Sequence, residues 1–324
     1  MIVAFWALLG CHHPLPPAPE TATVTGQAMG GNVRITVRCP VLEHSQCIDA
    51  ALVARSEIER IEHLATDFSP EGEISQLNAS AGGDPVAISP EVVQLLQESA
   101  RVSQATDGAF DITIGALWGL WDFRGGQIAD PKALAVRLPL VDWHGVHVSD
   151  GAASLEQPGM AVTLGGIAQG YAASRALDQM PGREAAVDVS GDIAVRGTWT
   201  IGIQHPRKSR GTTFATLSVR DAVLTTSGDY EQGFVQDGVR YHHVLDPKTG
   251  MPARGAISAT VVHPDGAIAD ALATALVVRG ADADAVSALG AWALVVTPDG
   301  VVHELGARDH VTVERKPTQI RHRW

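Results

Sequence analysis

The chain has 324 residues, of which 45% are hydrophobic and 19% charged, so it can bury a large core, and disorder does not describe most of it. The formal net charge is −12. This acidic balance argues against a nucleic-acid partner, because the body of the chain offers no basic stripe that could neutralise a phosphate backbone.

The N-terminal segment has the features of a lipoprotein signal. Residues 1–10 are almost wholly apolar and too few to span a bilayer as a helix. Leu8, Leu9, Gly10 and Cys11 have the form of a bacterial lipobox, which predicts a signal peptide at 1–10 and a lipid anchor on Cys11. The alternative is an apolar segment with a free or buried cysteine.

A lipid anchor would place the protein in the bacterial cell envelope, facing the periplasm, with His12 favouring the outer membrane. The proline-rich stretch at 11–20 predicts an extended tether, and the basic cluster at 315–324 predicts a solvated tail. We therefore expect one folded module at 21–314. Cys39 and Cys47 could pair in an oxidising compartment, but two unpaired buried thiols fit the sequence equally well.

Secondary structure can be predicted in chain order from periodicity and caps. Alternation at 23–25 and 33–37 predicts two strands, with a turn at 29–31. Helical spacing predicts an amphipathic helix over 48–64. Ser89 as N-cap and Pro90 at the first position predict a second helix, over 90–106.

The second half of the chain reads differently. A glycine-rich turn leads into a helix within 163–180, and short β segments separated by turns follow from Val187 onward. An Ala-rich helix is expected at 265–278, with Asp265 as N-cap and Gly280 after its end. Helices and antiparallel strands without regular βαβ alternation predict an α+β fold. We expect a single module, with two lobes and the functional site between them.

Four segments contain residue types suited to chemistry. Asp270 and Thr274 lie four positions apart on one helix face and could offer oxygen ligands to Mg²⁺, although such a pair alone is typical of a surface face. The turn at 163–170 could bring backbone amides to a phosphate, or serve packing only. The segment 240–253 contains His242 and His243, whose imidazoles titrate near neutrality.

The fourth segment, 106–121, contains a turn and an aromatic residue, Phe110, that could cover a ring system. Asp111 could accept a hydrogen bond from a ligand, while a buried capping role is the ordinary interpretation. Together with other short motifs, these segments resemble the ApbE family of FAD:protein FMN transferases. The resemblance rests on Met29-Gly30, FSPEGEISQLN, TDGAFD, LGGIAQGYA, SGDIAVRG, WTIGIQHP, TSGDYEQ, HVLDPKTG and ADALATAL, in this order.

The resemblance implies a role for individual residues. Asp270, Thr274 and the backbone carbonyl of Gly166 match the positions that bind Mg²⁺, or alternatively Mn²⁺, in the family. His243 is the candidate for contacting the pyrophosphate or assisting deprotonation of the attacking hydroxyl, and Asp270 is the other catalytic candidate. The positions that match the family's flavin and pyrophosphate site are Met29, Phe68, Ala109, Phe110, Asp111, Gln169 and His243.

Two positions depart from the usual family pattern. Gln169 stands where many members have Lys or Glu, so it could form a hydrogen bond without adding charge. The segment DVSGD at 188–192 replaces a more usual Asn-Leu-Gly-Gly-Asp form. Neither change touches the inferred metal ligands, and we expect an active enzyme.

The resemblance implies that a Thr or Ser hydroxyl of a periplasmic or membrane-associated flavoprotein attacks the FMN phosphorus of FAD and that AMP leaves. Two alternatives stay open. The same site could hydrolyse FAD to FMN and AMP, or the chain could be a lipoprotein that binds FAD without catalysis.

Overall fold

The computed structural model describes residues 20–315. The predicted signal peptide, the lipid anchor at Cys11, the tether up to residue 19 and the basic tail beyond Arg315 lie outside the described residues. Among residues 20–315, no helix is long and apolar enough to cross a bilayer.

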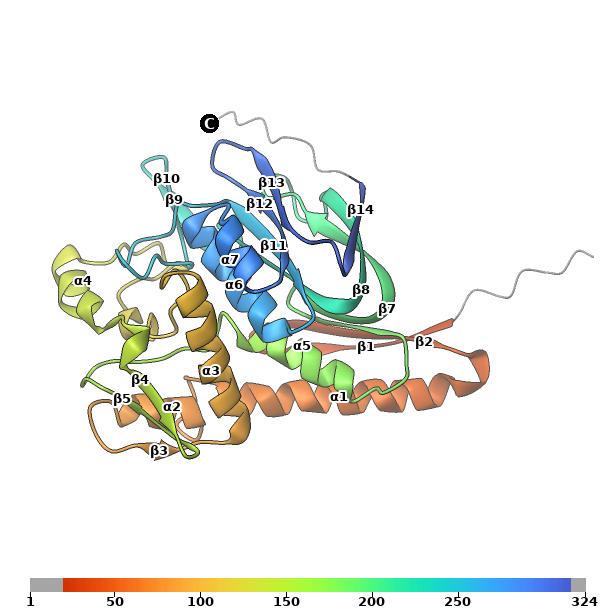
Figure 1. Cartoon of the computed structure of the whole chain (residues 1–324), viewed down its shortest axis with the longest axis horizontal. Coiled ribbons are helices and arrows are strands. Elements are labelled where there is room, and N and C mark those ends of the chain that lie inside the picture. Colours follow the sequence, from red (N-terminus) through yellow and green to blue (C-terminus); the bar gives the residue numbers. More distant parts are fainter. Residues whose placement is uncertain (1–19, 316–324) are drawn as a thin grey trace, which may run out of the picture.

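A nine-stranded antiparallel sheet forms the larger part of the molecule (Figure 1). Its strands in spatial order are β1 (Glu20–Ala28), β2 (Gly31–Cys39), β6 (Ala185–Val189), β7 (Asp192–Gln204), β8 (Thr213–Gly228), β11 (Ser258–His263), β12 (Trp292–Val296) and β13 (Val302–Gly306). The ninth strand, β14 (Val311–Arg315), pairs with the first half of β8, whereas β11 pairs with its second half. Distant parts of the chain are therefore joined in one sheet.

The smaller part lies at the left of Figure 1. It contains α2 (Glu73–Ala79), α3 (Pro90–Ala105), α4 (Pro131–Arg137) and the three-stranded sheet of β3 (Val86–Ala87), β5 (Ala152–Leu155) and β4 (Val146–Ser149). The remaining helices are α1 (His44–Ala65), α5 (Ala168–Asp178), α6 (Gly266–Arg279) and α7 (Ala283–Ala288), and β9 (Gly233–Gln236) pairs with β10 (Val239–His242). Mixed helices and antiparallel sheets confirm the predicted α+β class.

The first hairpin forms as its sequence predicts. Alternating residues of β2 are buried, and Met29 and Gly30 adopt φ values of 52° and 76° at the turn. Two successive left-handed residues give the turn whose twist matches that of paired strands. At the other end of the hairpin, the structure pairs Cys39 with Cys47, which resolves the alternatives that the sequence left open.

Helix α6 lies at the centre of the molecule. Eleven of its fourteen residues are buried, so it is apolar on all sides rather than amphipathic. The side chain of Asp265 accepts hydrogen bonds from the amides of Ala267 and Ile268, and Gly280 follows the last helical residue with φ 84°. Both predicted caps are confirmed. They fix the ends of the helix that positions Asp270 and Thr274.

Candidate functional site

Asp270 lies where α5 and α6 cross. An added Cβ on Gly170 would lie 2.1 Å from the Gly266 carbonyl oxygen, and one on Gly266 would lie 2.0 Å from the Gly170 carbonyl oxygen. Only glycine therefore fits on either side of this backbone contact. The close crossing directs the first turn of α5 at the Asp270 carboxylate, whose Oδ2 accepts a hydrogen bond of 3.1 Å from the Gly170 amide.

The Asp270 side chain is buried, with 6% of the residue exposed. Burial raises its pKa to about 7, although hydrogen bonds from the Gly170 and Gln169 amides act in the opposite direction. Amides at a helix N-terminus favour negative charge, but here they only partly offset desolvation. A cation bound beside the carboxylate would therefore stabilise its ionised form.

Asp192, the first residue of β7, adds a second buried carboxylate. Burial raises its pKa well above the usual range, and the charges of Asp270 and Asp188 raise it further. No hydrogen bond or ion pair to the Asp192 side chain is present among residues 20–315. Two like charges in one buried region disfavour their ionised forms unless a cation lies nearby. The electrostatics therefore suit a divalent metal.

Thr274 and Gly166 meet one turn further along α6. An added Cβ on Gly166 would lie 3.4 Å from Thr274 Oγ1 and 3.3 Å from a ring carbon of Phe110. Thr274 Oγ1 also lies 3.2 Å from Ser227 Oγ at the end of β8. The structure therefore brings the Gly166 backbone next to the hydroxyl that lies one helical turn from Asp270. No group of three or more His, Cys, Asp or Glu side chains that could hold a metal occurs in the described part of the chain.

The Met29 turn is held against this cluster. The Met29 amide donates to Glu62 Oε1 at 2.7 Å, and the Met29 carbonyl accepts from Gln169 Nε2 at 2.9 Å. Gln169 lies in the first turn of α5, next to the amide of Gly170 that contacts Asp270. The departure from the family pattern at position 169 thus provides a neutral link between the turn and α5.

The segment from Ala109 to Asp111 is buried beside Gly166. Asp111 Oδ1 accepts from the amide and hydroxyl of Thr113, and Oδ2 accepts from the Trp143 amide at 3.0 Å. Burial raises the pKa of Asp111 despite these hydrogen bonds. Because both carboxylate oxygens already have partners in the protein, the geometry favours the capping interpretation of Asp111 over a ligand contact.

Phe68 and His243 are the most exposed of the predicted site residues. Phe68 is 82% exposed, and its ring centroid lies 6.1 Å from that of Trp118. His243 follows β10, and its backbone amide donates to the Gln232 carbonyl oxygen at 3.1 Å. Its neighbour His242 is instead buried, with Nε2 2.9 Å from the Ala253 carbonyl oxygen.

The turn after His243 is tied to the turn before Ala109. Lys248 Nζ and Asp107 Oδ2 form an ion pair of 2.8 Å, and the Arg279 guanidinium lies 3.7 Å from the same carboxylate oxygen. These contacts hold the pKa of Asp107 below its usual range. Two motifs that lie 141 residues apart in sequence therefore meet at one edge of the site.

Sequence reasoning missed three residues that shape the site. Asp192 and Ser227 were inside motifs used for the resemblance, but strand alternation alone gave them no chemical role. Glu62 lies on a polar position of the predicted first helix, where a surface carboxylate is ordinary. Each acts through a contact between distant segments, which local patterns do not reveal.

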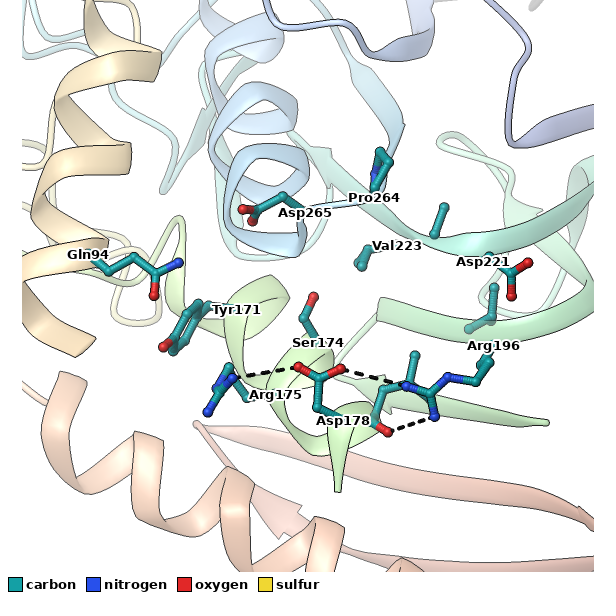
Figure 2. Close-up of a pocket in the computed structure, with 13 residues that line it drawn as sticks. Gln94, Tyr171, Ser174, Arg175, Asp178, Arg196, Asp221, Val223, Pro264 and Asp265 are labelled. Atoms are coloured by element: carbon teal, nitrogen blue, oxygen red, sulfur yellow. Dashed lines mark hydrogen bonds and ion pairs between the residues drawn. The ribbon is translucent and has the colours of Figure 1, made fainter. Parts of the chain in front are cut away.

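A large cavity lies elsewhere, among α5, α3 and the neighbouring strands (Figure 2). Its volume is about 450 Å³, and none of the predicted site residues lines it. Figure 2 shows Asp178 between Arg175 and Arg196, with each ion pair at 3.6 Å. Charges that are paired within the protein leave little for a ligand to neutralise, so size alone does not identify the site.

Comparisons with known proteins agree with the motif resemblance. The family model described as "ApbE family" matches residues 29–290. A Klebsiella pneumoniae protein named "FAD:protein FMN transferase" is 35% identical over 247 residues, covering 73% of this chain and 78% of the relative. A Treponema pallidum protein of the same name is 32% identical and covers 76% of this chain and 75% of the relative.

Solved structures show the same fold. An ApbE protein from Thermotoga maritima superposes with a TM-score of 0.79 at 29% identity, covering 88% of this chain and 97% of the other. A structure described as flavin transferase ApbE from Vibrio cholerae gives a TM-score of 0.77 at 26% identity, covering 89% and 97%. The residues that the family model matches, 29–290, include all ten predicted site residues. The chain belongs to the ApbE family.

Proposed function

We propose that the chain is an FAD:protein FMN transferase. The observation that carries this function is the cluster of Asp270, Thr274 and Gly166, which family motifs from distant segments bring together. The relatives named for this activity support it, because they align over most of both chains. In the reaction, a hydroxyl oxygen of an acceptor protein forms a bond to the FMN phosphorus of FAD. The bond from that phosphorus to the bridging oxygen breaks, and AMP leaves with that oxygen.

The cluster fits a hard divalent cation. Asp270 supplies a carboxylate, Thr274 a hydroxyl and Gly166 a backbone carbonyl, and oxygen ligands of this kind suit Mg²⁺ or Mn²⁺. The raised pKa of Asp270 supports the fit, because a bound cation would offset the desolvation that now disfavours its ionised form. When bound, the metal supplies charge neutralisation for the phosphate oxygens of FAD.

The other residues orient the substrate and handle the proton. Met29, held by Glu62 and Gln169, forms one rigid edge of the FAD site, and Phe110 covers Gly166. Phe68 offers an exposed aromatic face to the flavin. His243 contacts the pyrophosphate or takes the proton from the acceptor hydroxyl, since its exposed position lets it meet an incoming protein chain.

The acceptor is a flavoprotein of the bacterial envelope. The lipobox at Leu8–Cys11 supports a lipid anchor, and the Cys39–Cys47 disulfide supports an oxidising compartment such as the periplasm. An enzyme anchored in this way would meet acceptors that are associated with a membrane.

The test is to incubate the protein with FAD and Mg²⁺, with and without a periplasmic flavoprotein, and to measure AMP and protein-bound FMN. We expect equal amounts of AMP and acceptor-linked FMN, and loss of both on adding a chelator. AMP with free FMN in the presence of acceptor would show hydrolysis instead. FAD binding without any release of AMP would contradict both the transferase and the hydrolase, and would favour a protein that binds FAD without catalysis.

A further inference from the structure

Phe68 and Trp118 form an exposed aromatic pair. They are 82% and 54% exposed, and they are the only exposed Phe, Trp or Tyr residues within the described range 20–315. Large apolar side chains that are exposed together usually mark a site for a ligand or partner. This pair is therefore a candidate binding site for a ligand or a partner protein.

The two rings lie in tilted contact, and each keeps a face open to solvent. Their centroids lie 6.1 Å apart and their planes are tilted by 59°, so they are not stacked on each other. Trp121, only three residues further on, is different: it is 9% exposed, stacks on Phe123 at 5.6 Å and donates from Nε1 to the Gly250 carbonyl. The Trp121 ring is packed in the core, whereas the Trp118 ring keeps one face exposed to solvent.

Trp118 is also held in place. Its Nε1 donates to Asp67 Oδ2 at 3.2 Å, and its carbonyl accepts from the Arg137 guanidinium at 2.7 Å. The indole N–H therefore already has a partner, and what remains available is the flat apolar face. A fixed aromatic face binds a ring at low cost in conformational entropy.

The segment that carries Trp118 begins at the metal cluster. Phe110 contacts Gly166, and the Thr163 amide donates to the Ile112 carbonyl at 2.8 Å. Further along, an added Cβ on Gly115 would lie 2.7 Å from the Ala161 carbonyl oxygen, so this backbone runs tightly beside the strand-like residues before Gly166. The aromatic pair thus lies at the end of a continuous wall that starts at the cluster.

We infer that Trp118 is a flavin-binding residue, whose open face together with that of Phe68 forms an aromatic platform for the isoalloxazine ring. This inference rests on the proposed function, because that function supplies the planar ligand. The isoalloxazine is the larger of the two ring systems of FAD and offers the most flat area to an exposed aromatic face, and Phe68 matches the position that lines the flavin in the family. The adenine ring and an acceptor side chain are the competing occupants.

The test measures the binding of the two halves of FAD separately, with FMN and AMP as probes and Mg²⁺ present. Trp118→Ala should weaken FMN binding about tenfold, as expected for the loss of one ring contact, and leave AMP binding unchanged. Trp118→Phe should keep FMN binding within about threefold of wild type, since it retains a ring. Val136→Ala is the matched control, because Val136 is also exposed but lies on α4.

Unchanged FMN binding in Trp118→Ala would overturn the inference. Weaker AMP binding would assign Trp118 to the adenine, and a higher KM for the acceptor with unchanged FMN binding would assign it to the partner protein; either result also overturns it. A wild-type protein that binds FMN through Trp118 but never transfers it would contradict the proposed function and still support the role of Trp118 in flavin binding.

Discussion

In the cavity beside α5, Asp178 forms ion pairs of 3.6 Å with Arg175 and Arg196, and the three side chains are 57%, 40% and 30% exposed, respectively. Around Asp270, by contrast, two carboxylates are buried together, and within the described part of the chain only that of Asp270 receives hydrogen bonds, both from backbone amides. The charges of this ion-pair group are matched within the protein, whereas no cation of residues 20–315 compensates the two carboxylates of the cluster. The difference teaches that an uncompensated buried charge is a better guide to chemistry than the size of a hollow.

The largest expected effect is from Asp270→Ala. Removing the only carboxylate among the predicted ligands should lower metal-dependent FMN transfer at least about 100-fold, the cost of losing a key electrostatic contact to a transition state. The measurement is protein-bound FMN against time at saturating FAD. The same substitution should not destabilise the metal-free protein, because it removes a buried charge. Normal transfer by this variant would remove Asp270 from the mechanism.

The second prediction concerns pH. Burial raises the folded-state pKa of Asp270 to about 7, above the usual value of 3.8, so folding favours the protonated form. Its contribution to stability is therefore fully present below pH about 4 and is lost as pH rises toward 7. In chelator, the melting temperature should fall over this window less in Asp270→Asn than in wild type. Mg²⁺ should raise the wild-type value most at the upper end, where the carboxylate is ionised.

A smaller effect is expected from Gln169→Ala. The side-chain amide of Gln169 donates to the Met29 carbonyl. Its loss removes one of the two hydrogen bonds that hold the Met29 turn in its left-handed conformation. One neutral hydrogen bond contributes about 1 kcal/mol, so the KM for FAD should rise by about fivefold with a smaller change in kcat. Gln169→Glu is the informative companion, because it removes the donor and keeps the size. Unchanged KM in both variants would leave the link without a role.

The smallest effect is expected in the cavity. Arg175→Ala and Asp178→Asn break ion pairs whose side chains are 40% and 57% exposed. Such pairs contribute roughly 0–1 kcal/mol, so stability should change little and FMN transfer should stay within about twofold of wild type. A tenfold loss of transfer without loss of folding would show that the cavity belongs to the functional site and would reverse the comparison.

The sequence predicted what depends on neighbouring residues. The caps at Asp265 and Gly280 and the Met29-Gly30 turn are local, because each is set by a few adjacent side chains and φ angles. The short helices α4 and α7 were not predicted, since six or seven residues give too little periodicity.

The order of the sheet and the charge environment could not be predicted from local patterns. The pairing of β2 with β6 and the position of Asp192 near Asp270 depend on segments that are far apart in the chain. For the ligand set, the spacing of Asp270 and Thr274 predicted a shared helix face, but only the family resemblance suggested Gly166. The close approach of Gly166 to Thr274 gives that suggestion a physical basis.

The first hairpin also sets the distance between the N-terminal end of the described chain and the Met29 turn of the site. Glu20 pairs with Cys39 at one end of the hairpin, and the Met29 turn lies at the other. A strand that rises about 3.4 Å per residue separates these two ends by about 27 Å. Holding the protein by Glu20 on a surface or a bead therefore leaves the Met29 turn a full strand length from the point of attachment. An acceptor fixed to the same surface must extend its reactive hydroxyl across that distance.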